Sequence, residues 1–271
     1  MKVYISVDME GLAFVNDWDE VEKSKEDFIF FAQEMKKEVL AACKAINEID
    51  NKSEIYIRDA HWTARNLNLE DLPDNVKLIR GWGESPESMV EFIDDSFDCA
   101  VFIGYHIGGH SGKNPISHTI SENVRYIKIN GQFVSEFDIY GLAASYFNVP
   151  VVFVSGDEAL INHINNKYPN IETLATIRGK GDATICLLNS KQTCDLINKK
   201  LKVRLERKQF EKMNIPEKIC MEISFQKHKV AYAMSYYPNV KKIDDFTISF
   251  ESNDYYEVLR FKFFAMKLLD I

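Results

Sequence analysis

The sequence predicts an α/β fold with a mainly parallel sheet that carries helices on both faces, followed by a smaller α+β C-terminal part. Strand-like and helix-like segments alternate through about residue 165, which is typical of parallel sheets with helical crossovers. FDCAVFIGYH and VPVVFVSGD are almost continuously apolar, as expected of strands buried on both faces. We therefore predict an α/β metal-binding catalytic domain over residues 1–170 and a smaller α+β part packed against it over residues 171–271.

The predicted first domain opens on a strand in which Val3, Ile5 and Val7 share the buried face. The segment 20–50 predicts a long amphipathic helix, because its apolar residues recur every three or four positions. The other predicted elements are strands at 53–61 and 76–81, a short helix at 85–95, a strand at 97–106, a hairpin at 124–134, a helix at 135–147, a strand at 149–157 and a helix at 157–168.

The pattern of the chain changes beyond residue 170. TLATIRGKGDATICLL (173–188) and KICMEISFQKHKVAYAMSY (218–236) each predict a pair of strands. Helices are expected near 189–205 and at 254–269. These elements predict the smaller α+β part.

Composition argues against several classes of partner. The 33 basic and 41 acidic residues give a net charge of −8, which argues against a nucleic-acid surface as the main partner. No window approaches the roughly 18–20 apolar residues of a membrane span, and the N-terminus predicts a strand instead of an export signal. The five cysteines contain no CxxC pair and predict reduced thiols. We expect a cytoplasmic protein without a membrane partner.

Side chains that favour metals follow several of the predicted strands. Asp8 and Glu10 follow the first strand and share a face, because residues two apart on a strand point the same way. His61 ends the second strand and His106 ends a later one. Ligands gather beyond the carboxyl ends of the strands in open α/β sheets, so these residues should converge. Taken alone, the acidic pair could equally be a solvated strand end.

The predicted convergence indicates a metal centre. Imidazole and carboxylate ligands without thiolate suit Zn²⁺ or Mn²⁺, and enough candidate ligands exist for two ions. A carboxylate such as Asp8 could bridge the ions, which would hold the two like charges at this strand end together. Two cations about 3.5–4 Å apart polarise a carbonyl and activate water for hydrolysis. Asp59, two residues before His61, could orient an imidazole or simply face solvent.

Two further residues are candidates for the same site. The segment 106–120 is rich in Gly, Ser and His, which indicates either an active-site loop or a flexible surface loop. In the first case His118 would return to the site at the end of the loop. Glu136 opens a predicted helix, where a carboxylate favours the helix dipole and could also serve as a ligand.

These motifs, in this order, resemble the zinc-dependent D-aminopeptidase family. The resemblance rests on VDMEG, the D-x-H end of the second strand, GYH, SH about a dozen residues later, and the Glu that opens the next helix. It spans residues 7–136. It implies a metal-dependent aminopeptidase, a hydrolase that removes N-terminal D-amino acids from short peptides. Nothing in the residues themselves distinguishes D- from L-substrates.

The same resemblance implies the roles of individual residues. It implies two zinc ions per chain, with Asp8 bridging both ions and His118 as the catalytic residue. The remaining ligands that it implies are Glu10, His61, His106 and Glu136. It also implies a homo-oligomer, a homodecamer of two stacked pentamers.

The residues alone leave two other functions open. A di-metal amidase or phosphoesterase would use the same ions on another bond. A phosphoesterase also needs a basic clamp for phosphate, for which Lys113 and Arg125 are the candidates. The third hypothesis is a metal-stabilised peptide-binding protein without catalysis.

Overall fold

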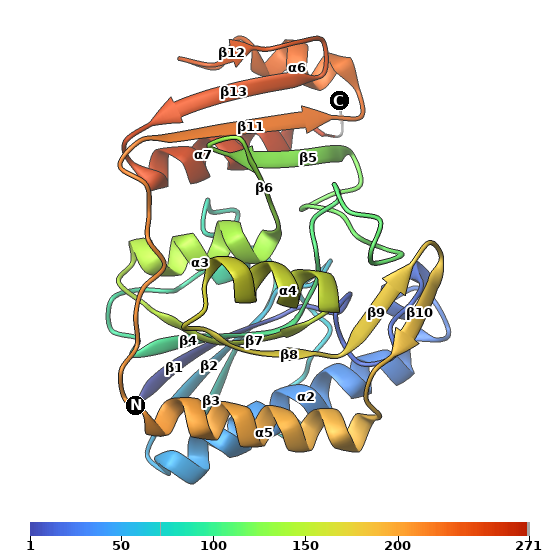
Figure 1. Ribbon diagram of the computed structural model, residues 1–271, viewed down its shortest axis with the longest axis vertical. Coiled ribbons are helices and arrows are strands. Elements are labelled where there is room, and N and C mark those ends of the chain that lie inside the picture. The colour runs from blue at the N-terminus through green and yellow to red at the C-terminus, as the bar shows by residue number, and fades with distance from the viewer. Residues whose placement is uncertain (71, 270–271) are drawn as a thin grey trace.

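The computed structural model describes residues 1–70 and 72–269 and contains a parallel sheet that underlies the candidate site (Figure 1). Its strands are β1 (Lys2–Val7), β2 (Glu54–Asp59), β3 (Val76–Ile79), β4 (Cys99–Tyr105), β7 (Val151–Gly156) and β8 (Glu172–Ala175). They are arranged in the order β3-β2-β1-β4-β7-β8, and every neighbouring pair is parallel. The carboxyl ends of β1, β2 and β4 therefore lie next to one another.

Helices cover both faces of this sheet, which confirms the predicted fold class. Helices α2 (Phe28–Ile49) and α5 (Ser190–Glu206) pack side by side on one face. Helices α3 (Glu136–Tyr146) and α4 (Glu158–Lys167) lie on the other face, against β4 and β7 (Figure 1). Alternate residues of β1 enter two separate apolar clusters, since Tyr4 belongs to one cluster and Ile5 to the other.

A second, antiparallel sheet lies above α3 and α4 in Figure 1. Its strands are β5 (Val124–Ile129), β6 (Gln132–Val134), β11 (Ile219–Phe225), β12 (Lys241–Lys242) and β13 (Thr247–Ser252), in the order β12-β13-β11-β5-β6. It packs against α6 (His228–Met234) and α7 (Tyr255–Lys267). Strands β9 (Ile177–Lys180) and β10 (Ala183–Cys186) form a separate hairpin.

Each of the two larger sheets contains strands from both sides of residue 170. The hairpin of β5 and β6 precedes residue 170 but belongs to the second sheet, whereas β8 follows it and completes the parallel sheet. Helix α5 also follows residue 170, and it packs on α2. The division into 1–170 and 171–271 stays a prediction about folding units.

Three predicted elements differ in detail from the observed ones. The expected strand pair over 218–236 is β11 followed by α6, because Val230, Ala231 and Met234 lie at helical spacing and are buried together. The long helix begins at Phe28, after a separate short turn, α1 (Trp18–Val21). The short helix expected at 85–95 is a single 3₁₀ turn, η1 (Ser88–Val90).

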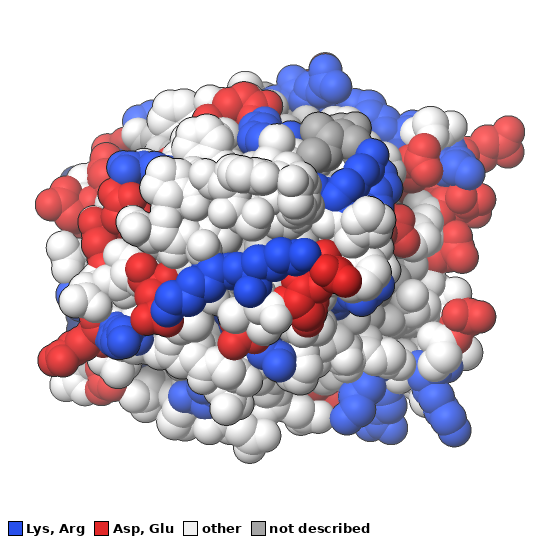
Figure 2. Space-filling model, turned by 90° about the horizontal axis from the view of Figure 1, so that it is seen from above, with Lys and Arg blue, Asp and Glu red and all other residues white. Residues whose placement is uncertain are grey.

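The surface carries charges of both signs. Seen from the end of the molecule that carries the second sheet, basic and acidic side chains are interspersed, and a row of basic side chains flanked by acidic ones crosses the middle of the face below an uncharged area (Figure 2). No helix in the described part of the chain combines the length and the apolar character that crossing a bilayer requires.

Candidate metal centre

The chain after β1 passes close to the end of β4, and this approach positions Asp8 and Glu10. The amide of Asp8 donates to the carbonyl of Ile103 at 2.9 Å, and the amide of Gly11 donates to that of Gly104 at 2.8 Å. A Cβ at position 11 would lie only 1.9 Å from the carbonyl oxygen of Tyr105. Glycine therefore lets the chain cross the end of β4 directly after Glu10.

Asp8, Glu10 and His61 form a first group of potential ligands. One ligand atom from each residue lies within 4.8 Å of the other two, and all three residues are buried. The Nδ1 atom of His61 lies 3.1 Å from Asp8 Oδ1 and 3.1 Å from Glu10 Oε2. Its Nε2 lies 2.9 Å from the carbonyl oxygen of Val21. Because a carbonyl only accepts hydrogen bonds, Nε2 carries a proton and Nδ1 can offer its lone pair.

Asp8 also belongs to a second buried group, with His106 and Glu136. His106 Nε2 lies 3.7 Å from Asp8 Oδ2 and 3.5 Å from Glu136 Oε2. Its Nδ1 donates to the carbonyl of Ile107 at 2.9 Å. His106 Nε2 is buried without a hydrogen-bond partner. A metal ligand would satisfy this orphaned nitrogen, and the oxygen and imidazole donor set suits zinc.

Helix α3 positions Glu136 at its first residue. Ser135 caps the helix, since its hydroxyl accepts the backbone amide of Asp138 at 3.3 Å and its own amide donates to the Asp138 carboxylate at 2.9 Å. Asp138 is fully buried and is held by His163 at 2.9 Å. Glu136 Oε1 accepts the amide of Ile120 at 2.6 Å, at the end of the 106–120 segment. This hydrogen bond connects the loop to the metal centre.

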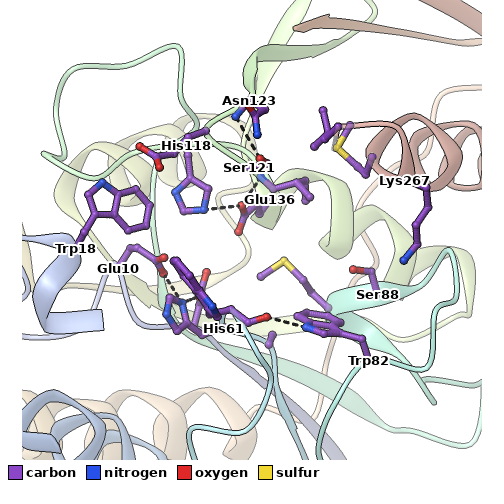
Figure 3. A pocket seen from close by; sticks show the side chains of 18 residues that line it. Glu10, Trp18, His61, Trp82, Ser88, His118, Ser121, Asn123, Glu136 and Lys267 are labelled. Carbon is purple, nitrogen blue, oxygen red and sulfur yellow. Dashed lines mark hydrogen bonds and ion pairs between the residues drawn. The ribbon is translucent and has the colours of Figure 1, made fainter. Parts of the chain in front are cut away.

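His118 approaches the cluster from that loop (Figure 3). Its Nδ1 donates to the carbonyl of Ile116 at 3.0 Å, and its Nε2 lies 3.6 Å from Glu136 Oε1. The ring lies against Trp18, with centroids 5.2 Å apart. The side chain of His118 is 13% exposed, whereas that of Glu136 is 3% exposed. His118 is thus more open to a substrate than His61, at 2%, or His106, at 0%, although it also forms a potential ligand group with Glu10 and His106.

The buried carboxylates impose a strong negative field on the histidines. Burial and the neighbouring Glu10 raise the pKa of Asp8 well above its usual value. Burial opposes a charge on Glu10, but His61 outweighs it and lowers the pKa of that carboxyl. Burial likewise opposes a charge on His106, yet Glu136 raises the pKa of its imidazole to about 10. This cluster attracts positive charge, which a divalent cation can supply.

The candidate centre lies in the wall of a cavity of about 740 Å³. Glu10, His61 and Glu136 face it on one side, and Ser88 and Lys267 lie on the other (Figure 3). All three tryptophans of the chain line this cavity. They come from three segments and are Trp18, Trp62 and Trp82.

The comparisons with known proteins identify the family. The family model described as D-aminopeptidase, Peptidase M55, matches residues 1–263. The chain belongs to the D-aminopeptidase family. A D-aminopeptidase of Bacillus subtilis (strain 168) is 30% identical over 261 residues, which cover 95% of this chain and 93% of that protein.

A solved structure extends the comparison with the D-aminopeptidase family to the three-dimensional fold. It is that of the Zn-dependent D-aminopeptidase DppA from Bacillus subtilis, described as a self-compartmentalizing protease. The two chains are 27% identical and superpose with a TM-score of 0.91, over 100% of this chain and 98% of that one. These findings confirm the resemblance and the predicted enzyme class, a metal-dependent aminopeptidase. They also support zinc as its metal.

The structure brings together all six residues that the sequence placed in the site of this D-aminopeptidase family member. Their roles as ligands and as the catalytic residue stay predictions. The six residues are Asp8, Glu10, His61, His106, His118 and Glu136.

Asp59 fits neither of its two predicted alternatives. It is fully buried, and its carboxylate accepts hydrogen bonds from the backbone amides of Asn66 and Leu67. Asn66 in turn donates to the carbonyl oxygen of His61. Asp59 therefore organises the loop after His61, while the carbonyl of Val21 orients the imidazole.

The cavity lining does not include Lys113 or Arg125, the candidates for a phosphate clamp, or His110 of the 106–120 segment. His110 stacks on Phe133, with ring centroids 4.6 Å apart. Arg125 lies over the ring of Phe246 and contacts Gln226. Neither Arg125 nor Lys113 lines the cavity. The basic clamp that a phosphoesterase would need is not formed by these two residues.

The tryptophans and Lys267 line the cavity but were not among the residues predicted from the sequence. Trp62 directly follows His61 and is 52% exposed, which is unusual for so large an apolar side chain. The indole of Trp82 donates to the carbonyl of Trp62 at 2.7 Å. The only available signal was the position of Trp62 directly after a predicted ligand.

Proposed function

We propose that this protein holds two zinc ions per chain and removes N-terminal D-amino acids from short peptides. The observation that carries the proposal is that Asp8 belongs to two ligand groups at once, one with Glu10 and His61 and one with His106 and Glu136. A carboxylate shared by two such groups is the arrangement that a bridged pair of ions requires. The D-specificity is supported by the family and by the names of the similar proteins.

The same hydrogen-bonding arrangement suits three histidines to metal binding or proton transfer. They are His61, His106 and His118. Each donates one ring N–H to a backbone carbonyl and directs its other nitrogen toward the carboxylates. Such carbonyl partners set the tautomer and the ring orientation of a ligating imidazole. When bound, zinc supplies Lewis acidity to the scissile carbonyl and to the attacking water.

We propose that His118 accepts a proton from the attacking water. Its Nδ1–H is committed to the carbonyl of Ile116, so Nε2 is the atom that can accept a proton from water. This tautomer favours a general base over an oxyanion donor, which would need a proton on Nε2. Trp18 and the ring of His106 flank the imidazole and limit its rotation. The cavity beside it has room for a short peptide.

We also propose a homodecameric assembly in the cytoplasm. The similar structure is described as a self-compartmentalizing protease. Large apolar side chains are exposed at Ile29, Phe92 and Tyr236, at 70%, 72% and 73%, and contacts between subunits would bury such side chains. All five cysteines are free thiols, which suits a reducing compartment. Light scattering should give a mass about ten times the 31.3 kDa chain; a monomer mass would contradict the assembly.

One experiment tests the proposed activity. The zinc-loaded protein is analysed for metal and assayed against matched D- and L-dipeptides and p-nitroanilides. We expect two zinc ions per chain and release of the N-terminal residue from D-peptides. Hydrolysis of phosphate esters instead would favour the phosphoesterase hypothesis, and cleavage of other amides would favour an amidase. Tight peptide binding without turnover would favour the binding protein.

A further inference from the structure

A buried lysine on α7 has no carboxylate partner. Lys262 is 1% exposed, and its ammonium donates to the phenolic oxygen of Tyr140 at 2.6 Å. No ion pair of Lys262 occurs within the residues that the structure describes. The charges of Glu136 and Glu87 act on this ammonium, but neither carboxylate forms an ion pair with it, so it lacks the contacting opposite charge that buried cations normally have.

Lys262 lines a recess of about 190 Å³ beside the main cavity. The recess and the cavity share five lining residues and are therefore adjacent. The shared residues are Trp82, Ser88, Ile120, Met266 and Lys267. A molecule in the cavity can thus reach the recess.

Lys262 is held by a residue of α3, the helix that also carries Glu136 of the metal centre. Tyr140 on α3 holds Lys262, and Ser88 lines both the cavity and the recess. Tyr140 follows Glu136 by four residues on α3, which corresponds to about 6 Å along the helix axis. An extended peptide spans about 3.3–3.6 Å per residue. A short peptide therefore matches the separation between the metal side and the lysine side.

The other basic residues around the cavity are already paired. Lys267 lines both the cavity and the recess, and it forms an ion pair with Glu84. The guanidinium of Arg58 lies 3.2 Å from Glu91 and covers the ring of Trp82 at 4.2 Å. Of the two lysines that line the recess in the described part of the chain, only Lys262 is without a carboxylate.

We propose that Lys262 binds the free C-terminal carboxylate of a short peptide whose amino end lies at the metal centre. The inference rests on the proposed peptidase function and adds the class of substrate, a short peptide with an unblocked C-terminus. Tyr140 acts as a positioning residue that holds the ammonium at the recess. A carboxylate in the recess supplies the missing counter-charge of Lys262.

Burial of the Lys262 ammonium also destabilises the folded chain. Burial lowers the pKa of its ammonium to about 7. Replacing it with an apolar residue of similar length should therefore raise the thermal midpoint while impairing use of the substrate. A lysine with a purely structural role would lower the midpoint when removed.

The test compares a D-dipeptide with its C-terminal amide in the zinc-loaded wild-type protein and in Lys262→Met. We expect the wild type to prefer the free acid by about 10-fold or more in kcat/KM, the ratio expected for one buried charge-assisted contact. In Lys262→Met, KM for the acid should rise by about this factor. Its kcat, and all constants for the amide, should change less than about twofold.

Several outcomes would overturn the inference. A wild type without preference for the acid over the amide contradicts it directly, whether or not the variant folds. An equal loss of both activities in Lys262→Met shows a structural role. A loss of acid preference in Lys267→Met but not in Lys262→Met moves the carboxylate to Lys267. A wild type that cleaves neither peptide contradicts the proposed function itself, and the inference fails with it.

Discussion

The imidazole rings of His106 and His118 stack with their centroids 4.5 Å apart and their planes inclined by 26°. The two residues stand at opposite ends of a Gly- and Ser-rich loop, so the loop closes on itself at the metal centre. His106 is fully buried, whereas His118 remains partly exposed to the cavity. The stack therefore separates a residue suited to ligation from one suited to contact with substrate.

Replacing His118 with alanine should separate metal binding from catalysis. We expect His118→Ala to retain both zinc ions while turnover falls by about 10²–10⁴-fold, the range typical for loss of a general acid–base group. Metal analysis and kcat are measured on the same preparation. His110→Ala, in the same loop but stacked on Phe133, is the matched control and should keep full activity. Zinc loss in His118→Ala would instead identify His118 as a ligand.

Replacing Asp8 with asparagine should remove metal from both ligand groups. The change keeps the size of the side chain but removes the charge that the two groups share. We expect zinc content to fall well below one ion per chain, with activity lost in parallel, because a neutral amide bridges two cations poorly. Elemental analysis after dialysis measures this. Two tightly bound ions in Asp8→Asn would contradict the bridging role.

A single methyl group at position 11 should disturb the site through the backbone. In Gly11→Ala the new Cβ would meet the carbonyl oxygen of Tyr105 at 1.9 Å. The strand ends must move apart, and we expect a loss of roughly 2–4 kcal/mol in stability together with weaker zinc binding. Gly112→Ala is the control, because nothing lies within 4 Å of a Cβ there. Equal thermal midpoints for the two variants would contradict this account.

We predict that the buried carboxyl of Glu38 makes the stability of the folded protein vary with pH, whether or not metal is bound. Burial raises the pKa of its carboxyl to about 8, and Oε1 accepts the amide of Ala13 at 2.9 Å. The folded state therefore favours the protonated form, and this contribution is lost as pH rises from about 4.5 through 8. Glu38→Gln should leave the thermal midpoint unchanged at pH 5. At pH 8.5 it should raise the midpoint, by about 2–4 °C for each kcal/mol of unfolding free energy that is recovered.

The exposed Glu26→Gln serves as the control for the loss of one negative charge. Its thermal midpoint should stay close to that of the wild type at both pH values. A gain in Glu38→Gln that is equal at pH 5 and pH 8.5 would show that the carboxyl is already charged throughout this range.

The sequence was sufficient for the parts of the site that follow from strand ends. Asp8, His61 and His106 were predicted to converge because parallel strands end at one edge of the sheet, and they do. Glu136 and His118 were open candidates from the residues alone, and the family resemblance implied their roles, because their positions follow from a helix start and a loop closure. The route of that loop is set by contacts such as the hydrogen bond from Ile120 to Glu136.

The rest of the cavity could not be predicted because long-range packing forms it. Lys262 lies on the last helix and meets Tyr140, 122 residues earlier in the chain. Its spacing in the sequence is that of any residue of an amphipathic helix. The same limit explains the error at α6, where alternate apolar residues are compatible with a strand until Ala231 is found buried.

The placement of all three tryptophans around one cavity has a practical consequence. Indole groups dominate the ultraviolet emission of a protein, and the tryptophan emission of this chain originates entirely at the candidate site. Trp18, Trp62 and Trp82 come from three separate segments, and the emission therefore depends on their assembly around a common space. Titration with zinc or with a non-hydrolysable peptide can be followed directly, without a label and without turnover.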